Sequence, residues 1–252
     1  MISKTVRRVT KLVRNIPNLW QGYNLYVNRD KLRLIDFTFE HVFPEAKSFA
    51  DLGGVWKVNA AYSLHTVKRS GVERGGLVDT NYPEGLKARL RRYPGLSVVE
   101  GDFSLAEIAS VVGRVDVVYF FDVLLHQANP NWDEVLGMYA EFSPCFVIYN
   151  QQLIQGEDAV RLTDLPLERC VELVSNLRYD TYKYIYEHKT EVHPQYHKPW
   201  GDIHNVFQWG ITDKALRATM TRLGYKEVFF RNYGRFLDLP AFENHAFIFR
   251  RS

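Results

Sequence analysis

The most informative stretch of this 252-residue chain is Phe49-Ala-Asp-Leu-Gly-Gly-Val55. A short apolar run reaches Asp51, and Gly53 and Gly54 follow at once. This pattern is typical of a buried parallel strand that runs into a tight turn and then a helix. Glycines at such a turn let the backbone come close to a bound ligand. Three further strand ends follow, each with a polar residue, so the pattern indicates an α/β nucleoside-binding domain.

Strand-like and helix-like segments alternate downstream of this stretch. Five short apolar runs predict strands at 48–52, 76–79, 96–100, 115–121 and 145–149. The segments between them predict helices at 57–70, 83–92, 104–112 and 131–141. Short apolar strands that alternate with helices imply a parallel sheet covered on both faces.

The end of the chain predicts a helix from 212 to about 223 and two more strands, at 225–230 and 246–250. The connection between these two strands is too short for a helical crossover, so they should pair antiparallel. The predicted fold is therefore α/β, with a doubly wound, seven-stranded, mostly parallel sheet and an antiparallel C-terminal strand pair.

Three segments organise the chain around this sheet. Residues 1–47 predict a helical N-terminal lead-in, and residues 48–252 predict one domain. The alternation stops after the fifth strand and returns at Thr212, so about 151–210 form an insertion. Apolar residues at helical spacing over 2–16 predict an amphipathic basic helix, either packed on its own domain or in contact with an anionic surface.

Composition limits the class of protein. Hydrophobic residues make up 46% and charged residues 24%, which is ordinary for a globular domain. No apolar stretch has the roughly 18–20 residues of a membrane span. Residues 1–14 hold five basic residues and no acid, so with a net charge of +3 the rest of the chain is slightly acidic. This argues against a general nucleic-acid binder. Two cysteines, Cys145 and Cys170, suit a reducing compartment, and we expect a cytoplasmic location.

These elements and strand ends resemble the class I S-adenosylmethionine-dependent methyltransferase family, over about 48–150 and 212–251. The resemblance implies S-adenosylmethionine as cofactor. Ala50-Asp-Leu-Gly-Gly54 is similar to the first family motif, which implies that Asp51, Gly53 and Gly54 hold the methionine end. A nicotinamide-dependent reductase is the alternative with this layout. It would carry Gly-x-Gly-x-x-Gly at the first turn, which this sequence does not supply.

Residues at three more strand ends also resemble motifs of this family. The resemblance implies that Asp79 takes the ribose hydroxyls, that Asp102 with Phe103 contacts the adenine, and that Asp122 belongs to the fourth motif. A carboxylate can accept hydrogen bonds from both ribose hydroxyls, and ligands in open α/β sheets bind outside the carboxyl ends of the strands. Val55 and Lys57 depart from the family's later motif glycines. The ammonium of Lys57 would repel a sulfonium unless it faces solvent or pairs with an acid.

Candidate catalytic residues lie after the fourth strand and in the insertion. The His126 region resembles the Leu-His-Asp-Trp region of small-molecule O-methyltransferases, in which the histidine is a general base. Asp202 and His204 alternate, so they could share one side of an extended segment and act as a base pair. Insertions above the cofactor site form acceptor pockets or lids, and this one is rich in aromatic residues and histidines. His245 is a weaker base candidate.

A metal site is an alternative reading of the same histidines. His193 and His197 have helical zinc spacing, although Pro194 disfavours a helix there. Asp122, His204 and an amide of Asn150 or Gln151 could hold a divalent ion around a diol. The amides of Gln151 and Gln152 could instead contact the acceptor. We expect no required metal.

The predicted function is S-adenosylmethionine-dependent O-methylation of a small molecule or saccharide, by in-line transfer with a histidine base. A nucleic-acid amine methyltransferase would carry Asn/Asp-Pro-Pro-Tyr at the end of the fourth strand. Here Asn129-Pro-Asn-Trp132 comes too late to match. Two alternatives stay open: a non-catalytic cofactor-binding regulatory module, and a protein or nucleic-acid methyltransferase recruited by the basic N-terminus. The oligomeric state is also open, and a homodimer is one arrangement compatible with the sequence.

Overall fold

The computed structural model describes residues 15–17, 26–83, 85–236 and 239–251. The amphipathic helix predicted over 2–16 lies almost wholly outside these residues. In the described part of the lead-in, β1 (Asn15–Pro17) pairs with β2 (Tyr26–Asn28), and α2 (Arg29–Phe37) continues into the π-helix η2 (Thr38–Val42). The lead-in is therefore partly helical, with a short strand pair that the sequence did not indicate.

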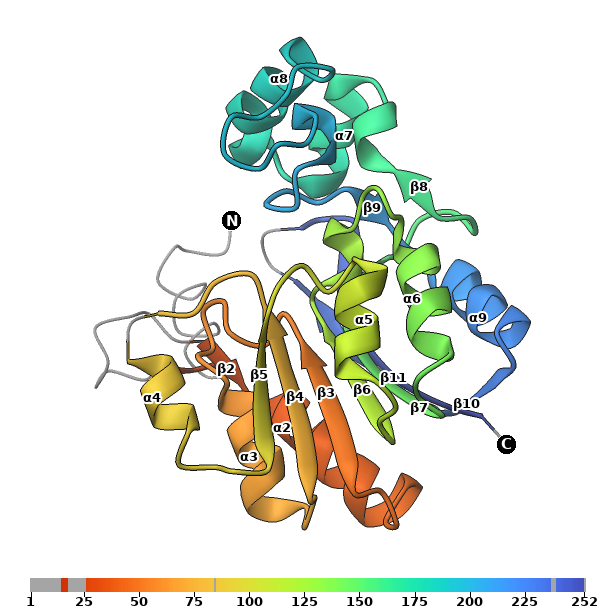
Figure 1. The fold of residues 1–252 in the computed structure, drawn as a ribbon. Helices are drawn as coiled ribbons and strands as arrows, with labels where there is room; N and C mark the ends of the chain where they lie inside the picture. The colour runs from red at the N-terminus through yellow and green to blue at the C-terminus, as the bar shows by residue number, and fades with distance from the viewer. Residues whose placement is uncertain (1–14, 18–25, 84, 237–238, 252) are drawn as a thin grey trace. The chain divides into compact units, whose positions relative to one another are not determined.

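A seven-stranded sheet organises the fold (Figure 1) and has the order β10-β11-β7-β6-β3-β4-β5. Its strands are β3 (Ser48–Leu52), β4 (Arg74–Asp79), β5 (Leu96–Glu100), β6 (Val117–Phe121), β7 (Cys145–Leu153), β10 (Tyr225–Arg235) and β11 (Phe242–Arg251). β3 pairs in parallel with β4 and β6, and β4 pairs in parallel with β5. β10 and β11 pair antiparallel. The predicted α/β fold, with its mostly parallel sheet and antiparallel C-terminal pair, is confirmed.

The central strands are buried because both faces of the sheet are covered. Every residue of β3, β6 and β7 is buried, as expected for strands of this apolar composition. Gly75 in β4 is required by packing, since a Cβ there would lie 2.4 Å from Cε1 of Phe49. In Figure 1, α5 (Ala106–Val112) lies on one face of this part of the sheet, and α2 and α3 (Ala61–Arg69) lie on the other.

Helix α3 begins four residues later than the sequence predicted. Lys57, Asn59 and Ala60 have φ values of 59°, 48° and 63°, which are left-handed and cannot continue a right-handed helix. The helix can start only after Ala60, its N-cap residue. The next helix, α4 (Leu86–Leu90), is shorter than the predicted 83–92. The left-handed φ of its N-cap residue Gly85 delays the start in the same way.

The insertion after β7 packs around a buried cluster that also includes Leu125 and Phe242 from outside it. It contains β8 (Val160–Arg161), α7 (Leu167–Val174), the 3-10 turn η5 (Asn176–Arg178), α8 (Tyr179–Glu187), the 3-10 turn η6 (Trp200–Asp202) and β9 (Trp209–Gly210). β8 and β9 pair antiparallel and bring the two ends of the insertion together. Apolar side chains from α7 and α8 pack into one buried cluster with Ile203, Val206 and Phe207. The chain then enters α9 (Asp213–Arg222), whose N-cap Thr212 accepts a hydrogen bond from the Ala215 amide at 3.1 Å, as its sequence predicts.

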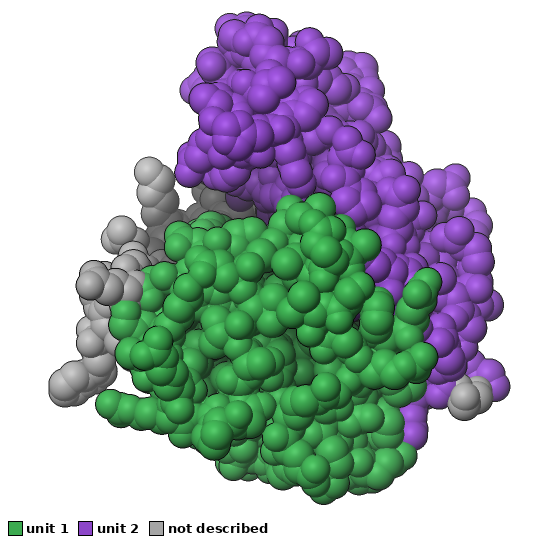
Figure 2. All heavy atoms as spheres, viewed as in Figure 1, with its two compact units in different colours: residues 1–121, 141–148 green, residues 122–140, 149–252 purple. Residues whose placement is uncertain are grey.

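The chain clusters into two compact units, coloured separately in Figure 2. Unit 1 is Met1–Phe121 and Glu141–Ile148, and unit 2 is Asp122–Ala140 and Tyr149–Ser252. Unit 1 carries the polar ends of β3, β4 and β5, and unit 2 carries Asp122, His126 and the insertion. Among the described residues, no helix is both long enough and apolar enough to cross a bilayer.

Candidate functional site

Asp51 is the central polar group of unit 1. It lies in β3, is 1% exposed, and its Oδ2 accepts a hydrogen bond from the Ser63 hydroxyl at 2.6 Å. Its Oδ1 is buried and has no hydrogen-bond partner among the described residues. Burial raises the pKa of Asp51 from 3.8 to about 6, the hydrogen bond from Ser63 opposes this rise, and the nearby charge of Asp79 adds to it. The result is a buried carboxyl group with acceptor capacity for a ligand that donates hydrogen bonds.

The two glycines after β3 form a tight turn around this carboxylate. Gly53 has a φ of 73°, and its amide donates to the carbonyl of Val78 at 2.8 Å. A Cβ on Gly54 would lie 2.4 Å from Oδ2 of Asp51, so no other residue fits there without displacing the carboxylate. These contacts explain why two glycines follow Leu52, one residue after Asp51.

Asp79 at the end of β4 holds the same turn from the neighbouring strand. Its Oδ2 accepts hydrogen bonds from the amides of Val55 at 2.9 Å and Trp56 at 3.3 Å. Its Oδ1 accepts a longer bond of 3.4 Å from the Asn81 amide. Burial raises the pKa of Asp79, and its backbone partners oppose the rise. From the sequence we expect Asp79 to accept hydrogen bonds from the ribose hydroxyls. The structure adds the hydrogen bonds from the turn amides to Asp79, which the sequence did not indicate. The two roles are compatible, because a carboxylate oxygen can accept more than one hydrogen bond.

Asp102 and Phe103 follow β5 in a turn with local hydrogen bonds. Oδ1 of Asp102 accepts from the amide of Ser104 at 3.0 Å and from its hydroxyl at 2.7 Å, which fixes the carboxylate orientation. Phe103 is 9% exposed. The Lys57 side chain lies at the surface, with its ammonium 4.0 Å from the ring centroid of the exposed Trp56. The expected repulsion of a sulfonium by Lys57 is thus relieved by solvent exposure.

Lys31 is a charged group of unit 1 that sequence reasoning missed. It lies in α2, is 4% exposed, and its ammonium is 5.5 Å from the ring centroids of both Tyr62 and Phe121. Its charge lowers the pKa of Asp51, against the larger effect of burial. The helical spacing of the sequence indicates its burial, because Lys31 shares the buried face of α2 with Leu34 and Ile35.

Asp122 is the first residue of unit 2 and one of its predicted site residues. It follows β6 directly and has a φ of 57°, a left-handed conformation that is strained for a residue other than glycine. Its amide donates to the carbonyl of Tyr149 at 2.7 Å. Its Oδ1 accepts from the Gln151 amide group at 2.8 Å, and the same nitrogen donates to Asn244 Oδ1 at 3.0 Å. Gln151, suggested by the sequence as an acceptor contact, thus orients Asp122.

His126 has a tautomer fixed by its surroundings. Its Nδ1 lies 2.7 Å from the carbonyl of Val206, and because a carbonyl only accepts, Nδ1 carries the proton. The neutral ring therefore has its lone pair on Nε2. The ring stacks on Phe207, with centroids 5.1 Å apart and an interplanar angle of 26°. Burial lowers the pKa of His126 from 6.5 to about 4, and the neighbouring His204 and Arg178 add to this lowering. The imidazole is thus neutral and weakly basic at pH 7.

Asp202 and His204 contact different partners. Asp202 forms an ion pair with Arg161, and its Oδ2 accepts from the Asn129 side chain at 3.4 Å. His204 Nε2 lies 3.0 Å from the ammonium of Lys198 and accepts its hydrogen bond. These contacts tie Asp202 to the start of the insertion, and they make His204 a neighbour of a cation.

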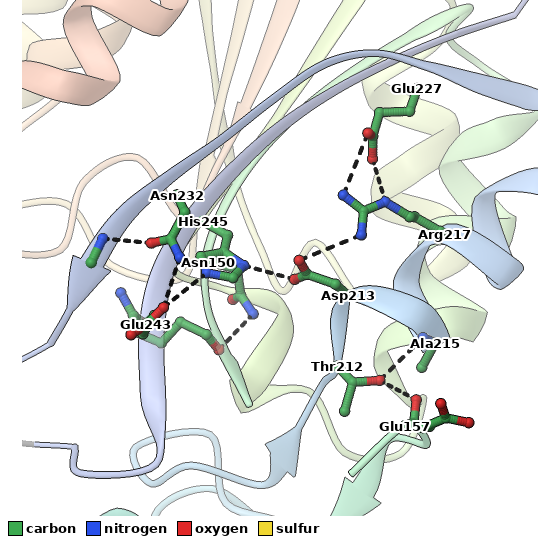
Figure 3. Close-up of polar contacts among 12 residues, drawn as sticks. Asn150, Glu157, Thr212, Asp213, Ala215, Arg217, Glu227, Asn232, Glu243 and His245 are labelled. Carbon is green, nitrogen blue, oxygen red and sulfur yellow. Dashed lines mark hydrogen bonds and ion pairs between the residues drawn. The ribbon is translucent and has the colours of Figure 1, made fainter. Parts of the chain in front are cut away.

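His245 lies in a charged network of β10, β11 and α9 (Figure 3). It is 5% exposed, and its Nδ1 is 2.8 Å from Oδ1 of Asp213, while its Nε2 is 3.6 Å from Oε2 of Glu243. Asp213 also pairs with Arg217 at 3.5 Å, and Arg217 pairs with Glu227 at 2.7 Å. The network joins α9 to the C-terminal strand pair, and His245 is part of that connection.

Within the described residues, no group of three or more His, Cys, Asp and Glu side chains is arranged to hold a metal ion. His193 and His197 are joined through the backbone, where the His197 amide donates to the His193 carbonyl at 3.0 Å. His193 Nδ1 accepts from the amides of Gln195 and Tyr196, at 3.1 and 3.3 Å. The His193 ring thus stabilises a turn.

The aromatic residues of the insertion divide into two groups. Tyr182 and Tyr186 hold the insertion together. The Tyr182 hydroxyl donates to the Phe207 carbonyl at 3.0 Å, and the Tyr186 hydroxyl contacts the carbonyls of Leu162 and Leu165 at 2.9 and 2.6 Å. Others are more than 40% exposed, namely Tyr179, Tyr184 and Tyr196. The density of aromatic residues therefore reflects a packed core as well as an exposed surface.

Comparisons with known proteins bear on the fold. No family model and no curated protein matches the chain. Among solved structures, the N-terminal domain of EvdMO1, crystallised in the presence of SAH and D-fucose, matches with a TM-score of 0.58 and 14% identity, over 100% of this chain and 97% of that one. The 1,6-didemethyltoxoflavin-N1-methyltransferase of Burkholderia thailandensis matches with a TM-score of 0.54 and 11% identity, over 98% and 88%.

An O-methyltransferase family protein from Burkholderia thailandensis also matches, with a TM-score of 0.53 and 16% identity. The match covers 89% of this chain but spans only 57% of that protein. At these identities the comparisons show the fold, which is that of the class I S-adenosylmethionine-dependent methyltransferases. The resemblance inferred from the strand ends is confirmed at the level of the fold.

Proposed function

We propose that this chain is an S-adenosylmethionine-dependent methyltransferase that O-methylates a small molecule or saccharide. The observation that carries the proposal is the Asp51 carboxylate, which is buried against the Gly53–Gly54 turn and whose Oδ1 has no hydrogen-bond partner in the described part of the chain. A buried acceptor of this kind suits the ammonium of an amino acid. The solved structures with the same fold include two that were crystallised with SAH and one with SAH and D-fucose.

The residues of unit 1 fit S-adenosylmethionine. Asp51 with Gly53 and Gly54 would hold the methionine end, Asp79 the ribose, and Asp102 with Phe103 the adenine. When bound, the cofactor supplies an electrophilic methyl group on a sulfonium. The protein's part is to hold an acceptor oxygen in line with that group and to take up its proton. We assign the cofactor to unit 1 and the acceptor to unit 2, with residues 151–210 and Asp122 as its binding segments.

His126 is our first candidate for the proton acceptor. Its Nδ1 proton is donated in a hydrogen bond to the Val206 carbonyl, so Nε2 is the atom that would accept a hydroxyl proton. With a pKa of about 4, the ring is unprotonated at neutral pH but weakly basic. It would therefore take up the proton late, as the hydroxyl becomes acidic during methyl transfer. His204 is the second candidate, and Asp202 supports it by fixing the insertion through Arg161.

A regulatory, non-catalytic cofactor-binding module is the second candidate function. The observation that favours it is the low basicity of His126, since a general base is most effective with a pKa near the working pH. We place either function in the cytoplasm. Both cysteines lie in the described part of the chain, are buried and form no disulfide, which supports a reducing compartment.

Titration calorimetry with S-adenosylhomocysteine tests the cofactor assignment. We expect binding to the natural sequence, and at least about tenfold weaker binding to Asp51→Asn, because a charge-assisted hydrogen bond contributes ~1.5–3 kcal/mol. Asp133→Asn is the matched control, since Asp133 makes a partly exposed ion pair with Arg222 at 3.6 Å. Equal affinity of all three proteins would exclude the assignment.

Methyl transfer from labelled S-adenosylmethionine to a panel of hydroxylated acceptors separates the two functions. Transfer to a hydroxyl supports the enzyme, and tight cofactor binding without transfer to any acceptor supports the module. D-fucose belongs in the panel because it was present in the EvdMO1 crystals.

A further inference from the structure

Arg178 differs from the other cations of the insertion in its partners. The insertion holds six lysines and arginines, and four of them form ion pairs: Arg161 with Asp202, Arg169 with Glu172, Lys183 with Glu187, and Lys189 with Asp164. The fifth, Lys198, donates to His204. Within the described residues, no carboxylate lies in ion-pair contact with the guanidinium of Arg178.

The position of Arg178 is set by an aromatic ring. Its guanidinium carbon lies 4.6 Å from the centroid of Phe207, and that ring stacks on His126 at 5.1 Å. Phe207 is 6% exposed and is held by backbone bonds to the Tyr182 hydroxyl. The Arg178 side chain itself is partly exposed. Cation–π contact thus holds the planar guanidinium against Phe207, the ring that also stacks on His126, while Arg178 as a whole stays partly exposed.

A second cation of the insertion, Lys198, contacts the other candidate histidine, His204. The Lys198 ammonium is 3.0 Å from His204 Nε2, and His204 is close enough to His126 to affect its protonation. Asp122 is a carboxylate whose charge acts on His126 in the opposite sense, and its Oδ1 is bound by Gln151. The charges that act on His126 are therefore the guanidinium of Arg178 and the carboxylate of Asp122, which already accepts a hydrogen bond from Gln151.

We propose that Arg178 binds a carboxylate or phosphate group carried by the acceptor. This inference rests on the proposed function and narrows its substrate class to hydroxylated small molecules with an anionic group, such as an acidic or phosphorylated sugar. A guanidinium offers two parallel N–H donors that match the oxygens of either group. Partial burial also limits the screening of this charge by salt.

Binding of the anion has a consequence for His126. An anion next to the ring favours the imidazolium, so it raises the pKa of His126 from its low value. The base would become stronger when its acceptor is present and stay neutral otherwise. Acceptor recognition and proton uptake would then be coupled through one arginine.

The direct test is an NMR titration of the histidine ring signals of the full chain with inorganic phosphate, and separately with acetate. We expect a saturable shift of the His126 signals and an increase in its pKa with at least one of the two anions. Arg178→Met, which keeps an unbranched apolar stem, should abolish the effect, and Arg178→Lys should restore part of it. Arg169→Met is the matched control, because Arg169 has an acidic partner in Glu172 at 3.0 Å.

Cofactor affinity, measured by calorimetry, separates this proposal from the proposed function. If S-adenosylhomocysteine does not bind but the anions act through Arg178, the cofactor assignment fails and the anion site stands. If neither anion shifts His126, or if Arg178→Met responds like Arg169→Met, the anion site is wrong. With an active acceptor pair that differs only in an anionic group, such as glucose 6-phosphate and glucose, Arg178→Met should raise KM about 10–100-fold for the anionic member alone.

Discussion

A Cβ atom on Gly54 would lie 2.4 Å from Oδ2 of Asp51, so the glycine and the carboxylate share one space. The turn after β3 can therefore exist only with a glycine at position 54, or with Asp51 displaced. This relationship ties the stability of the turn to the geometry of the proposed cofactor site.

Gly54→Ala should displace the Asp51 carboxylate and so weaken cofactor binding at least about tenfold. It should also lower the free energy of unfolding by ~1–3 kcal/mol, as expected for overpacking in a buried site. Calorimetry and urea denaturation measure the two effects. Gly137→Ala is the control, because a Cβ there meets only Leu223 Cδ2 at 3.9 Å in α6 (Trp132–Ala140). Unchanged affinity in Gly54→Ala would show that Asp51 does not hold the ligand.

Asp51→Asn should make the protein more stable at pH 8 while it weakens cofactor binding. Burial raises the pKa of Asp51 from 3.8 to about 6, so the folded state holds a proton that the unfolded state releases between these values. Stability therefore falls as the pH rises through this window, and the ionised group destabilises the fold above it. Asparagine removes that penalty, on the order of 1–3 kcal/mol.

Urea denaturation of Asp51→Asn and the natural sequence between pH 3.5 and 8 measures this difference. The two proteins should differ most above pH 6 and converge below about pH 4. A constant difference across the range would show that ionisation of Asp51 is not its cause.

Asp79→Asn should loosen the turn after β3 as well as weaken cofactor binding. Asp79 accepts hydrogen bonds from the amides of Val55 and Trp56, and a neutral amide oxygen accepts less strongly than a carboxylate. We expect faster hydrogen exchange at these two amides without ligand, and a loss of ~1.5–3 kcal/mol in binding S-adenosylhomocysteine. If hydrogen exchange at both amides is unchanged while the affinity for S-adenosylhomocysteine falls, Asp79 binds the ribose but does not stabilise the turn.

His126→Gln should lower turnover about 100-fold or more with little change in cofactor affinity, because the residue acts on the proton and not on the cofactor. The acid limb of the kcat/KM profile of the natural protein should lie near pH 4, the pKa of His126, and not near 6.5. If the acid limb of the kcat/KM profile lies near pH 6.5 and is still present in His126→Gln, another histidine is the base. His204→Gln is then the next variant to measure.

The same residue should govern acid stability. The pKa of His126 is about 4 when folded and near 6.5 when unfolded, so the unfolded chain takes up a proton first as the pH falls. Stability is therefore lost between pH 6.5 and 4, and His126→Gln should lose less of it over that range. Denaturation midpoints at pH 7 and pH 4.5 give the comparison.

Ala60→Gly should stabilise the start of α3. Ala60 has a φ of 63°, and a left-handed conformation costs roughly 1–2 kcal/mol for a residue with a Cβ, which exceeds the entropy penalty of glycine. The control Ala218→Gly, in the right-handed interior of α9, should instead destabilise by ~1 kcal/mol. Thermal unfolding of the two variants should therefore shift in opposite directions.

Local composition was enough to predict the sheet. Apolar runs such as 48–52 and 117–121 are local, and burial on both faces follows directly from their composition. The same pattern predicts polar residues near the ends of the parallel strands, such as Asp51 in β3 and Asp79 in β4. The carboxyl ends of parallel strands lie on one edge, so their grouping was predictable without any knowledge of side-chain contacts.

The contacts of each polar group depend on the folded chain. The Nδ1 proton of His126 depends on a carbonyl 80 residues away, and Asp202 pairs with Arg161 across 41 residues. Asp79 binds amides 23 and 24 residues before it, and Lys31 comes to Asp51 through helix packing. Periodicity and motifs record only local preferences. Hydrogen-bond partners, burial and pKa are set by neighbours that folding brings together, and so no single stretch of this sequence contains them.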